Sequence, residues 1–159
     1  MTSKSSRNSK QFNKVKSFFR SLDKKKSIVY WKDEFNAFKG NLNDKGGVAG
    51  NAIIPPRPFI KQGIENGLQR AKVEYVKSVK DGFKKLDTKI PRQGLFEAGN
   101  ALAGGIKESI DSLFEPELSP MTINIRRSNG NDSTKPLIDT GEMRDSLRVL
   151  VVDKSFLQQ

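Results

Sequence analysis

A long stretch with helical spacing constrains the fold of this chain more than any other feature of its sequence. An apolar residue recurs every three or four positions at Ile60, Ile64, Leu68, Ala71, Tyr75, Val79, Phe83 and Leu86. This spacing predicts one amphipathic helix of roughly 40 Å, at a rise of about 1.5 Å per residue. Pro58 stands just before it, where a first helical turn loses no hydrogen bond. Such a helix needs a second element to cover its apolar stripe.

A second helical pattern follows the break at Thr88 to Pro91, and glycines interrupt it. Its apolar positions are Leu95, Phe96, Leu102, Ile106, Ile110 and Leu113. The glycines inside it, at positions 94, 99, 104 and 105, each cost up to about 1 kcal/mol relative to alanine in a helix interior. Glycines inside a helix are typical of places where two helix backbones approach closely. We therefore expect this helix to form an antiparallel pair with the long helix. The alternative is that the second helix bends or breaks at Gly104 and Gly105.

The C-terminal part of the chain combines a turn, a short helix and a strand. Asp139 and Glu142 have the spacing of a capping box, which predicts a short helix that begins near Thr140. Val149 to Val152 is a β-branched run of the kind found in strands buried on both faces. The expected fold class is α+β, mainly helical, with one long amphipathic helix packed on a second helix and a small β-sheet that includes the C-terminal strand. The core is expected to comprise both helices and this strand.

Three shorter stretches combine features of more than one kind of secondary structure. Ile28 to Trp31 has the composition of a short strand, but the spacing that follows favours a helix through Phe38 that ends at Gly40. Asn43 to Asn51 predicts a loop or loose hairpin. Met121 to Arg127 alternates like a strand, whereas Ser119 and Pro120 before it are typical of a helix start.

The N-terminal region carries most of the net charge of +11. Residues 1–26 hold nine Lys or Arg against one Asp, a net +8. Residues 1–8 lack apolar periodicity and are expected to form a mobile arm in isolation. Beyond them a basic amphipathic helix is predicted, and its apolar stripe is a candidate partner-binding surface formed by Phe12, Val15, Phe18, Phe19 and Leu22.

Two kinds of contact suit this helix. We favour docking on its own domain or on a neighbouring copy; a membrane surface, nucleic acid or another protein is the alternative. The predicted domain organisation is a basic arm and helix over residues 1–26 and a single domain over residues 27–159.

The composition limits the chemistry available to the protein. The chain has no cysteine and no histidine, which excludes disulfides, thiolate zinc sites and histidine acid-base catalysis. We therefore expect no enzyme activity, no catalytic residues and no cofactor. Asp139, Glu142 and Asp145 lie close together in sequence and suit a divalent cation, but capping and ion pairing explain them better, so no metal site is expected. No apolar run reaches the roughly 20 residues of a membrane span, and no signal peptide is evident, so we expect a soluble cytoplasmic protein.

Three segments together carry a resemblance to a known family. They are IPPRPFI at Ile54 to Ile60, LSP-x-T-I at Leu118 to Ile123 and KPLIDTG-x-M-x-x-SL at Lys135 to Leu147. In this order the segments resemble the signatures of phage virion morphogenesis proteins, also called tail completion, head-tail joining or neck proteins. The resembling positions include Pro56, Arg57, Pro58, Phe59, Pro136, Leu137, Asp139, Thr140, Gly141 and Met143. The family usually has a clearer hairpin before the Pro-Arg-Pro-Phe segment, and the resemblance favours a helix at Met121 to Arg127.

The resemblance implies a structural role in a virion. It implies a homo-oligomer, commonly a hexameric ring around the DNA channel, in the neck of a tailed phage or prophage and assembled in the cytoplasm of the bacterial host. The implied partners are a connector or stopper protein on the capsid side and a tail terminator or tail tube protein on the tail side. Non-specific DNA contact is a further expectation, and membrane contact is not. The alternative function is that of a standalone basic nucleic-acid-binding protein, which the sequence pI near 9.9 favours.

Overall fold

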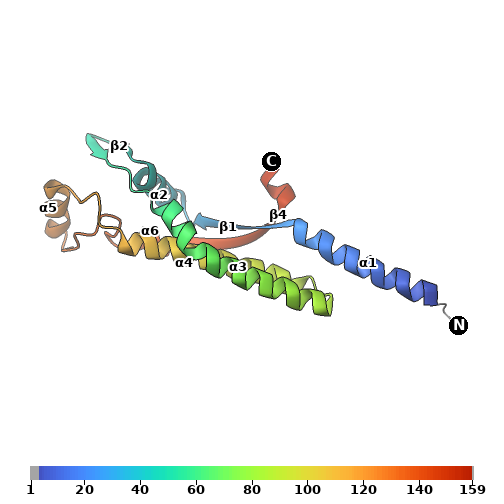
Figure 1. Ribbon diagram of the computed structural model, residues 1–159. Coiled ribbons are helices and arrows are strands. Elements are labelled where there is room, and N and C mark those ends of the chain that lie inside the picture. The colour runs from blue at the N-terminus through green and yellow to red at the C-terminus, as the bar shows by residue number, and fades with distance from the viewer. Residues whose placement is uncertain (1–3, 159) are drawn as a thin grey trace. The chain divides into compact units, whose positions relative to one another are not determined.

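The structure, a computed structural model, describes residues 4–158, with side chains described over residues 9–157. It is 64% helical and contains a two-stranded antiparallel sheet that includes the C-terminal strand, which confirms the predicted α+β class. In chain order the elements are α1 (Lys4–Asp23), β1 (Lys25–Trp31), α2 (Glu34–Lys45), β2 (Gly47–Ala49), β3 (Ala52–Ile54), α3 (Phe59–Lys85), α4 (Lys89–Ser112), α5 (Pro120–Ser128), α6 (Glu142–Asp145), β4 (Leu147–Asp153) and the short 3-10 helix η1 (Lys154–Gln158). Figure 1 shows their course.

The two long helices pack tightly against each other, as the glycines predict. A Cβ on Gly105 would lie 2.6 Å from the backbone nitrogen of Gly67 and closer still to the carbonyl oxygen of Gly63. A Cβ on Gly67 would lie 2.9 Å from the Cα of Leu102. These positions admit only a hydrogen atom, so glycine permits the backbone contact. The alternative of a break at Gly104 and Gly105 is wrong, because α4 is continuous through both residues.

The long apolar stripe of α3 is only partly buried, which corrects the prediction that it forms the core. Ala71 is buried, whereas Ile64, Leu68 and Phe83 are 41%, 39% and 43% exposed. The face of α3 that meets α4 consists largely of small residues, which place the two backbones too close together for large side chains between them. The large apolar residues therefore lie beside the contact and remain partly open to solvent.

Each of the two sheets has two strands. β1 pairs with β4, and β2 pairs with β3 in an antiparallel hairpin. The prediction that Val149 to Val152 is buried on both faces is wrong. Along β4 only Leu147 is buried and Leu150 is 46% exposed, because a two-stranded ribbon leaves one face uncovered.

The contacts divide the chain into two compact units. Unit 1 comprises residues 1–28, 70–100 and 149–159, and unit 2 comprises residues 29–69 and 101–148. α3, α4, β1 and β4 each contribute residues to both units. Unit 2 contains an apolar core cluster that consists of Phe59, Ile106, Ile110, Leu137, Met143 and Leu147.

Around the first residues of unit 2 the secondary structure differs from the prediction. Ile28 to Trp31 belongs to strand β1, and helix α2 starts only after Asp33, whose side chain accepts a hydrogen bond from the backbone nitrogen of Asn36 at 2.8 Å. Gly40 does not end this helix but lies within it. A Cβ at Gly40 would lie 2.8 Å from Cε2 of Trp31, so this glycine makes room for the indole ring.

In the connections of unit 2 several predictions are confirmed. Gly47 to Ile54 forms the hairpin that was one of the two alternatives there. The predicted helix at Met121 to Arg127 is α5, with Pro120 in its first turn and the Ser119 side chain as its N-cap. Pro120 fits because a first-turn residue donates no helical hydrogen bond.

Unit 1 contains the N-terminal helix, which begins at Lys4 and is longer than predicted; residues 1–3 of the expected arm lie outside the described residues. Phe18 is 1% exposed and packs on Phe83 with ring centroids 5.8 Å apart. Phe19 contacts the same ring at 5.4 Å. The C-terminal end of α1 therefore docks on its own chain, in agreement with the favoured interpretation. Among the helices that the structure describes, none is long and apolar enough to cross a membrane.

Candidate partner-binding surfaces

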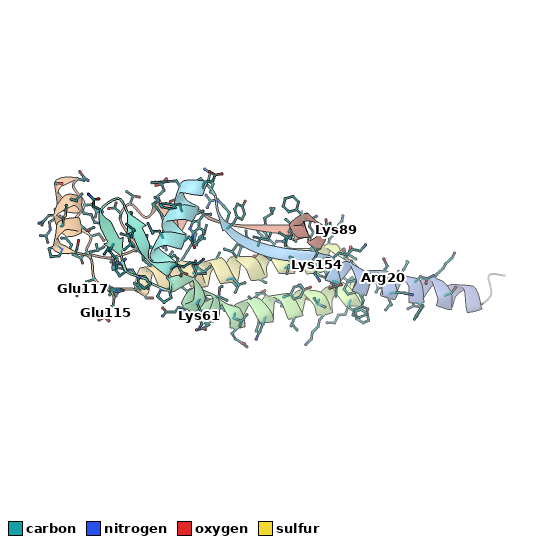
Figure 2. The ribbon with its side chains drawn as sticks, turned by 90° about the horizontal axis from the view of Figure 1, so that it is seen from above. Arg20, Lys61, Lys89, Glu115, Glu117 and Lys154 are labelled. Carbon is teal, nitrogen blue, oxygen red and sulfur yellow. The ribbon has the colours of Figure 1, made fainter. Side chains whose placement is uncertain are left out.

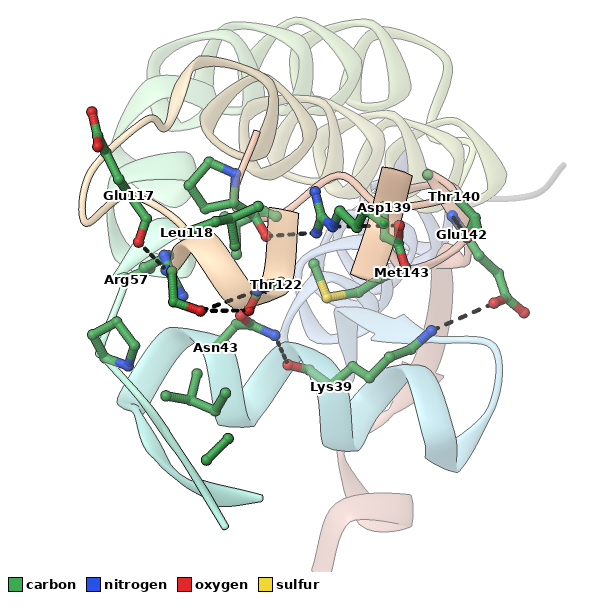
Figure 3. Close-up of a pocket in the computed structure, with 18 of the residues that line it drawn as sticks. Lys39, Asn43, Arg57, Glu117, Leu118, Thr122, Asp139, Thr140, Glu142 and Met143 are labelled. Atoms are coloured by element: carbon green, nitrogen blue, oxygen red, sulfur yellow. Dashed lines mark hydrogen bonds and ion pairs between the residues drawn. The ribbon is translucent and has the colours of Figure 1, made fainter. Parts of the chain in front are cut away.

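A groove of about 690 Å³ in unit 2 is lined by all three segments that carry the family resemblance. Strand β3 and Arg57 form one wall, α2 contributes Phe35 and Lys39, and the start of α5 contributes Thr122. Leu137 and Met143 line it from the C-terminal segment. In Figure 3 Arg57 with Glu117 and Lys39 with Glu142 lie at opposite sides of this groove. The segments are far apart in sequence, and the fold brings them to one place.

Two buried arginines hold these segments together through backbone carbonyls. The Arg57 guanidinium donates to the carbonyl oxygens of Pro116 at 3.0 Å and Glu117 at 3.3 Å, next to the Leu118 motif. Burial, and to a lesser extent the charge of Arg126, lowers the pKa of Arg57. Both arginines thus satisfy loop carbonyls that would otherwise be buried without partners.

Arg126 on α5 is the second of these arginines and is 9% exposed. It donates to carbonyl oxygens in the loop between α5 and α6, namely those of Ser133, Lys135, Pro136 and Ile138. Its Nε also lies 3.4 Å from an oxygen of Asp139. Sequence reasoning did not single out this residue, because an arginine on a short helix resembles an ordinary solvent-facing cation. The carbonyl oxygens of the loop that follows meet Arg126 only in the folded chain, so the sequence alone does not indicate this contact.

The predicted capping box of Asp139 and Glu142 is wrong. Helix α6 has Gly141 as its N-cap residue, in a left-handed conformation with φ of 81°, and glycine has no side chain that could act as a cap. Asp139 instead accepts a hydrogen bond from the Asn131 side chain at 2.6 Å, and Glu142 pairs with Lys39 at 3.4 Å. The left-handed turn at Gly141 displaces the chain from the geometry that reciprocal capping needs, and α6 is only four residues long.

The candidate metal-binding carboxylates each have a cationic partner. Asp139 pairs with Arg126, Glu142 with Lys39, and Asp145 with Arg144 at 2.6 Å. Within residues 4–158, no group of three or more acidic side chains is placed to hold a metal ion. The acids of this segment therefore serve the local structure.

The remaining motif residues lie at the start of α3 and in the C-terminal segment. Phe59 is fully buried in the core cluster with Leu137 and Met143. Pro56 precedes Arg57, and the first turn of α3 receives a cap from outside the helix, because the Asp44 side chain accepts a hydrogen bond from the backbone nitrogen of Ile60 at 2.9 Å. Pro58 precedes that turn and Pro136 lies beside the buried Leu137. The hydroxyl of Thr140 accepts a hydrogen bond from the backbone nitrogen of Glu142 at 3.4 Å.

The hairpin beside the groove carries an exposed apolar pair that sequence reasoning missed. Val48 and Ile53 are cross-strand partners and are 69% and 83% exposed. Gly50, the first of the two loop residues, has a φ of 60°, and glycine at this position is typical of a tight hairpin turn. The signal was present in the sequence, as a two-residue Gly-Asn turn between Val48-Ala49 and Ala52-Ile53.

The five predicted partner-binding residues of α1 do not share one environment. Phe18 is buried against Phe83, and Val15 and Leu22 are half-buried. Phe12 and Phe19 remain 66% and 53% exposed. Phe12 is therefore the large apolar side chain of this stripe that is most available to a partner.

Comparison of the chain with models of protein families, with curated proteins and with solved structures gives no match.

Proposed function

We propose that this protein is a structural tail completion or neck protein of a tailed bacteriophage or prophage, which joins the tail to the capsid connector as part of a ring around the DNA channel. In this role it works by assembly and has no catalytic activity. The proposed partners are further copies of itself, a connector or stopper protein on the capsid side, and a tail terminator or tail tube protein on the tail side.

One observation carries this proposal. The segments at Ile54 to Ile60, Leu118 to Ile123 and Lys135 to Leu147 suggested the family, and in the structure they line one groove of unit 2. Arg57 of the first segment bonds the backbone of Pro116, just before the second segment, and Arg126 bonds the backbone of Lys135 in the third. A shared structural role explains why the residues of the three segments occur together in one chain. Their common place in the fold therefore supports a structural motif and not a catalytic one.

The exposed apolar side chains support an assembly role. Val48 and Ile53 form an apolar pair on the hairpin, Phe35 on α2 is 65% exposed, and Phe12 on α1 is 66% exposed. Burying a large apolar side chain contributes roughly 1.5 to 3 kcal/mol, so a few such residues supply most of the energy of an interface. We propose that the hairpin and α1 contact neighbouring ring subunits or neck proteins.

The test is complementation of the phage or prophage that encodes this chain, after deletion of its gene. Deletion is expected to leave complete heads and tails that do not join, as seen by electron microscopy, and the wild-type gene is expected to restore infectious particles. Normal joining in the deletion strain would overturn the proposal.

Two substitutions refine the test. Ile53→Ser and Phe12→Ser each remove an exposed apolar side chain, so they are expected to preserve folding but to lower the yield of joined particles. Lys14→Gln with Lys16→Gln is the matched control on the exposed part of α1. The assembly role of Phe12 fails if the lysine pair abolishes joining and the Phe12 variant joins normally.

A further inference from the structure

Unit 1 contains a small hollow whose polar lining is cationic and hydroxylic. Its volume is about 200 Å³, below the roughly 300 to 1,000 Å³ of pockets that hold drug-sized ligands. The polar lining residues are Ser21, Lys25, Tyr75, Thr88, Lys89 and Arg92, and none of the residues that line the hollow is acidic. A hollow of this size and charge suits a small anionic group.

Several donors in this hollow have no partner in the described part of the chain. The Arg92 guanidinium, the Lys89 ammonium and the hydroxyls of Tyr75 and Thr88 make no hydrogen bond or ion pair with another described residue. Lys25 is partly engaged, since its Nζ lies 2.8 Å from Asp153. A tyrosine hydroxyl is a neutral donor at neutral pH, and burial raises the pKa of Tyr75 further above its ordinary value. The donors are thus available to a ligand.

Two other hollows of unit 1 share lining cations with this one. One, of about 490 Å³, is also lined by Lys89 and Arg92, and the other, of about 360 Å³, is also lined by Lys25 and Arg92. Asp153 is the one acidic residue among the lining residues of these two hollows, and it already pairs with Lys25. The cationic surface around Arg92 therefore extends beyond the space that a single small anion fills.

The net charge of the protein is concentrated in the same unit. Residues 1–28, 70–100 and 149–159 hold 18 Lys or Arg against six Asp or Glu, a net +12, whereas the rest of the chain holds 11 against 12, a net −1. Residues 1–26 hold +8 of this charge, and residues 70–100 add +4. Figure 2 labels three cations of unit 1, Arg20, Lys89 and Lys154, which come from three different elements. An extended polyanion matches this distribution better than an isolated ion does.

We infer that this hollow binds a phosphate group of a DNA backbone, with Lys89 and Arg92 as the charged donors and the Tyr75 hydroxyl as a neutral third donor. An arginine suits this task because its planar guanidinium donates two parallel hydrogen bonds to phosphate oxygens. The contact is to the backbone, so binding is expected to be independent of base sequence. The inference rests on unit 1 and does not depend on the proposed neck function.

The experiment measures binding of the purified full-length protein to a short labelled DNA duplex by fluorescence anisotropy over a series of salt concentrations. The test variant is Lys89→Gln with Arg92→Gln. The matched control is Lys77→Gln with Lys80→Gln, which removes the same charge from exposed positions of α3 that do not line the hollow. Loss of this one phosphate contact makes the slope of log affinity against log salt less steep by about 0.9, and lowers affinity by roughly eightfold near 0.1 M salt.

The control pair is expected to lower affinity clearly less than the test pair, and Tyr75→Phe, which keeps the ring and all charges, is expected to lower it several-fold. Equal losses of DNA affinity in the two double variants would overturn the inference, because the charge would then act without a specific site.

The second part of the experiment measures the binding of tripolyphosphate to the same variants. If the test variant loses tripolyphosphate binding but keeps wild-type DNA binding, the hollow takes free phosphate and the DNA assignment is overturned.

Discussion

The guanidinium of Arg126 donates a hydrogen bond to the carbonyl oxygen of Lys135 at 2.8 Å. This is one of four loop carbonyls that the side chain satisfies while it remains largely buried. Replacement by methionine keeps the length of the side chain but leaves these carbonyls without donors. We expect Arg126→Met to destabilise the protein by about 3 kcal/mol, since each buried unsatisfied group costs about 1 to 3 kcal/mol. Urea denaturation measures the loss.

The neighbouring arginine supplies the control for this substitution. The Arg127 side chain is 58% exposed and its nearest carboxylate, on Asp132, lies 3.9 Å away. We expect Arg127→Met to change the stability by less than about 0.5 kcal/mol, as for most surface substitutions. Equal effects of the two substitutions would contradict the role assigned to Arg126.

Two adjacent glycines of α4 are expected to respond to alanine in opposite directions. A methyl group at Gly105 would collide with the backbone of α3, whereas one at Gly104 would meet no atom within 4 Å. Gly105→Ala is therefore expected to destabilise by about 2 kcal/mol or more through overpacking against a backbone that cannot yield. Gly104→Ala is expected to stabilise by up to about 1 kcal/mol through helix propensity. Thermal unfolding of both variants followed by circular dichroism checks this pair, and a loss at both positions would show that α4 tolerates no added methyl group.

The two contacting rings of unit 1, Phe18 and Phe83, are expected to differ in their contribution to stability. Phe83 is 43% exposed, so Phe83→Ala is expected to cost about 1.5 kcal/mol, less than the roughly 3 to 5 kcal/mol of a fully buried aromatic. Phe18 is 1% exposed, so Phe18→Ala is expected to fall within that larger range. Chemical denaturation of the two variants gives the comparison. A larger loss at Phe83 than at Phe18 would mean that another copy or partner covers Phe83.

The start of α2 is expected to stabilise the protein in a way that depends on pH. Hydrogen bonds from the Asn36 side chain, and then from its backbone, hold the pKa of Asp33 below its ordinary value of 3.8. Because the folded state lowers this pKa, the stabilisation is present above the ordinary value and is lost as the pH falls through the folded-state value. Asp33→Ala is therefore expected to be less stable than the wild type at neutral pH, with a gap that narrows below about pH 4. A gap of constant size from neutral pH to pH 2 would contradict this account.

The parts of the fold that sequence reasoning predicted are those with a strong local signal. Periodicity located α3, the glycines of α4 indicated the close helix pair, and Ser119 with Pro120 marked the start of α5. In each case the residues that carry the signal also make the structure, because spacing, capping and the absence of a Cβ act over a few residues.

The parts that sequence reasoning missed depend on contacts between distant residues. The apolar stripe of α3 does not form the predicted core, because glycines bring the two backbones together and leave Ile64 and Phe83 at the sides. Asp139 and Glu142 have capping-box spacing, yet Asn131 and Lys39 take them as partners. The hollow around Arg92 is lined by residues of α1, β1, α3 and α4. Because these residues are far apart in sequence, no short motif indicates the site.

The glycine contacts between α3 and α4 also bear on how this protein can change over generations. Since Gly63, Gly67 and Gly105 hold the helices through their backbones, Ile64 and Leu68 are about two-fifths exposed and are not needed for that contact. We therefore expect mutations at these outer positions to leave the contact between the helices intact and to preserve the fold. The exposed side chains of the helix pair can thus change during evolution while the glycines of the contact stay the same. The same separation makes the pair a suitable scaffold for selecting new binding surfaces.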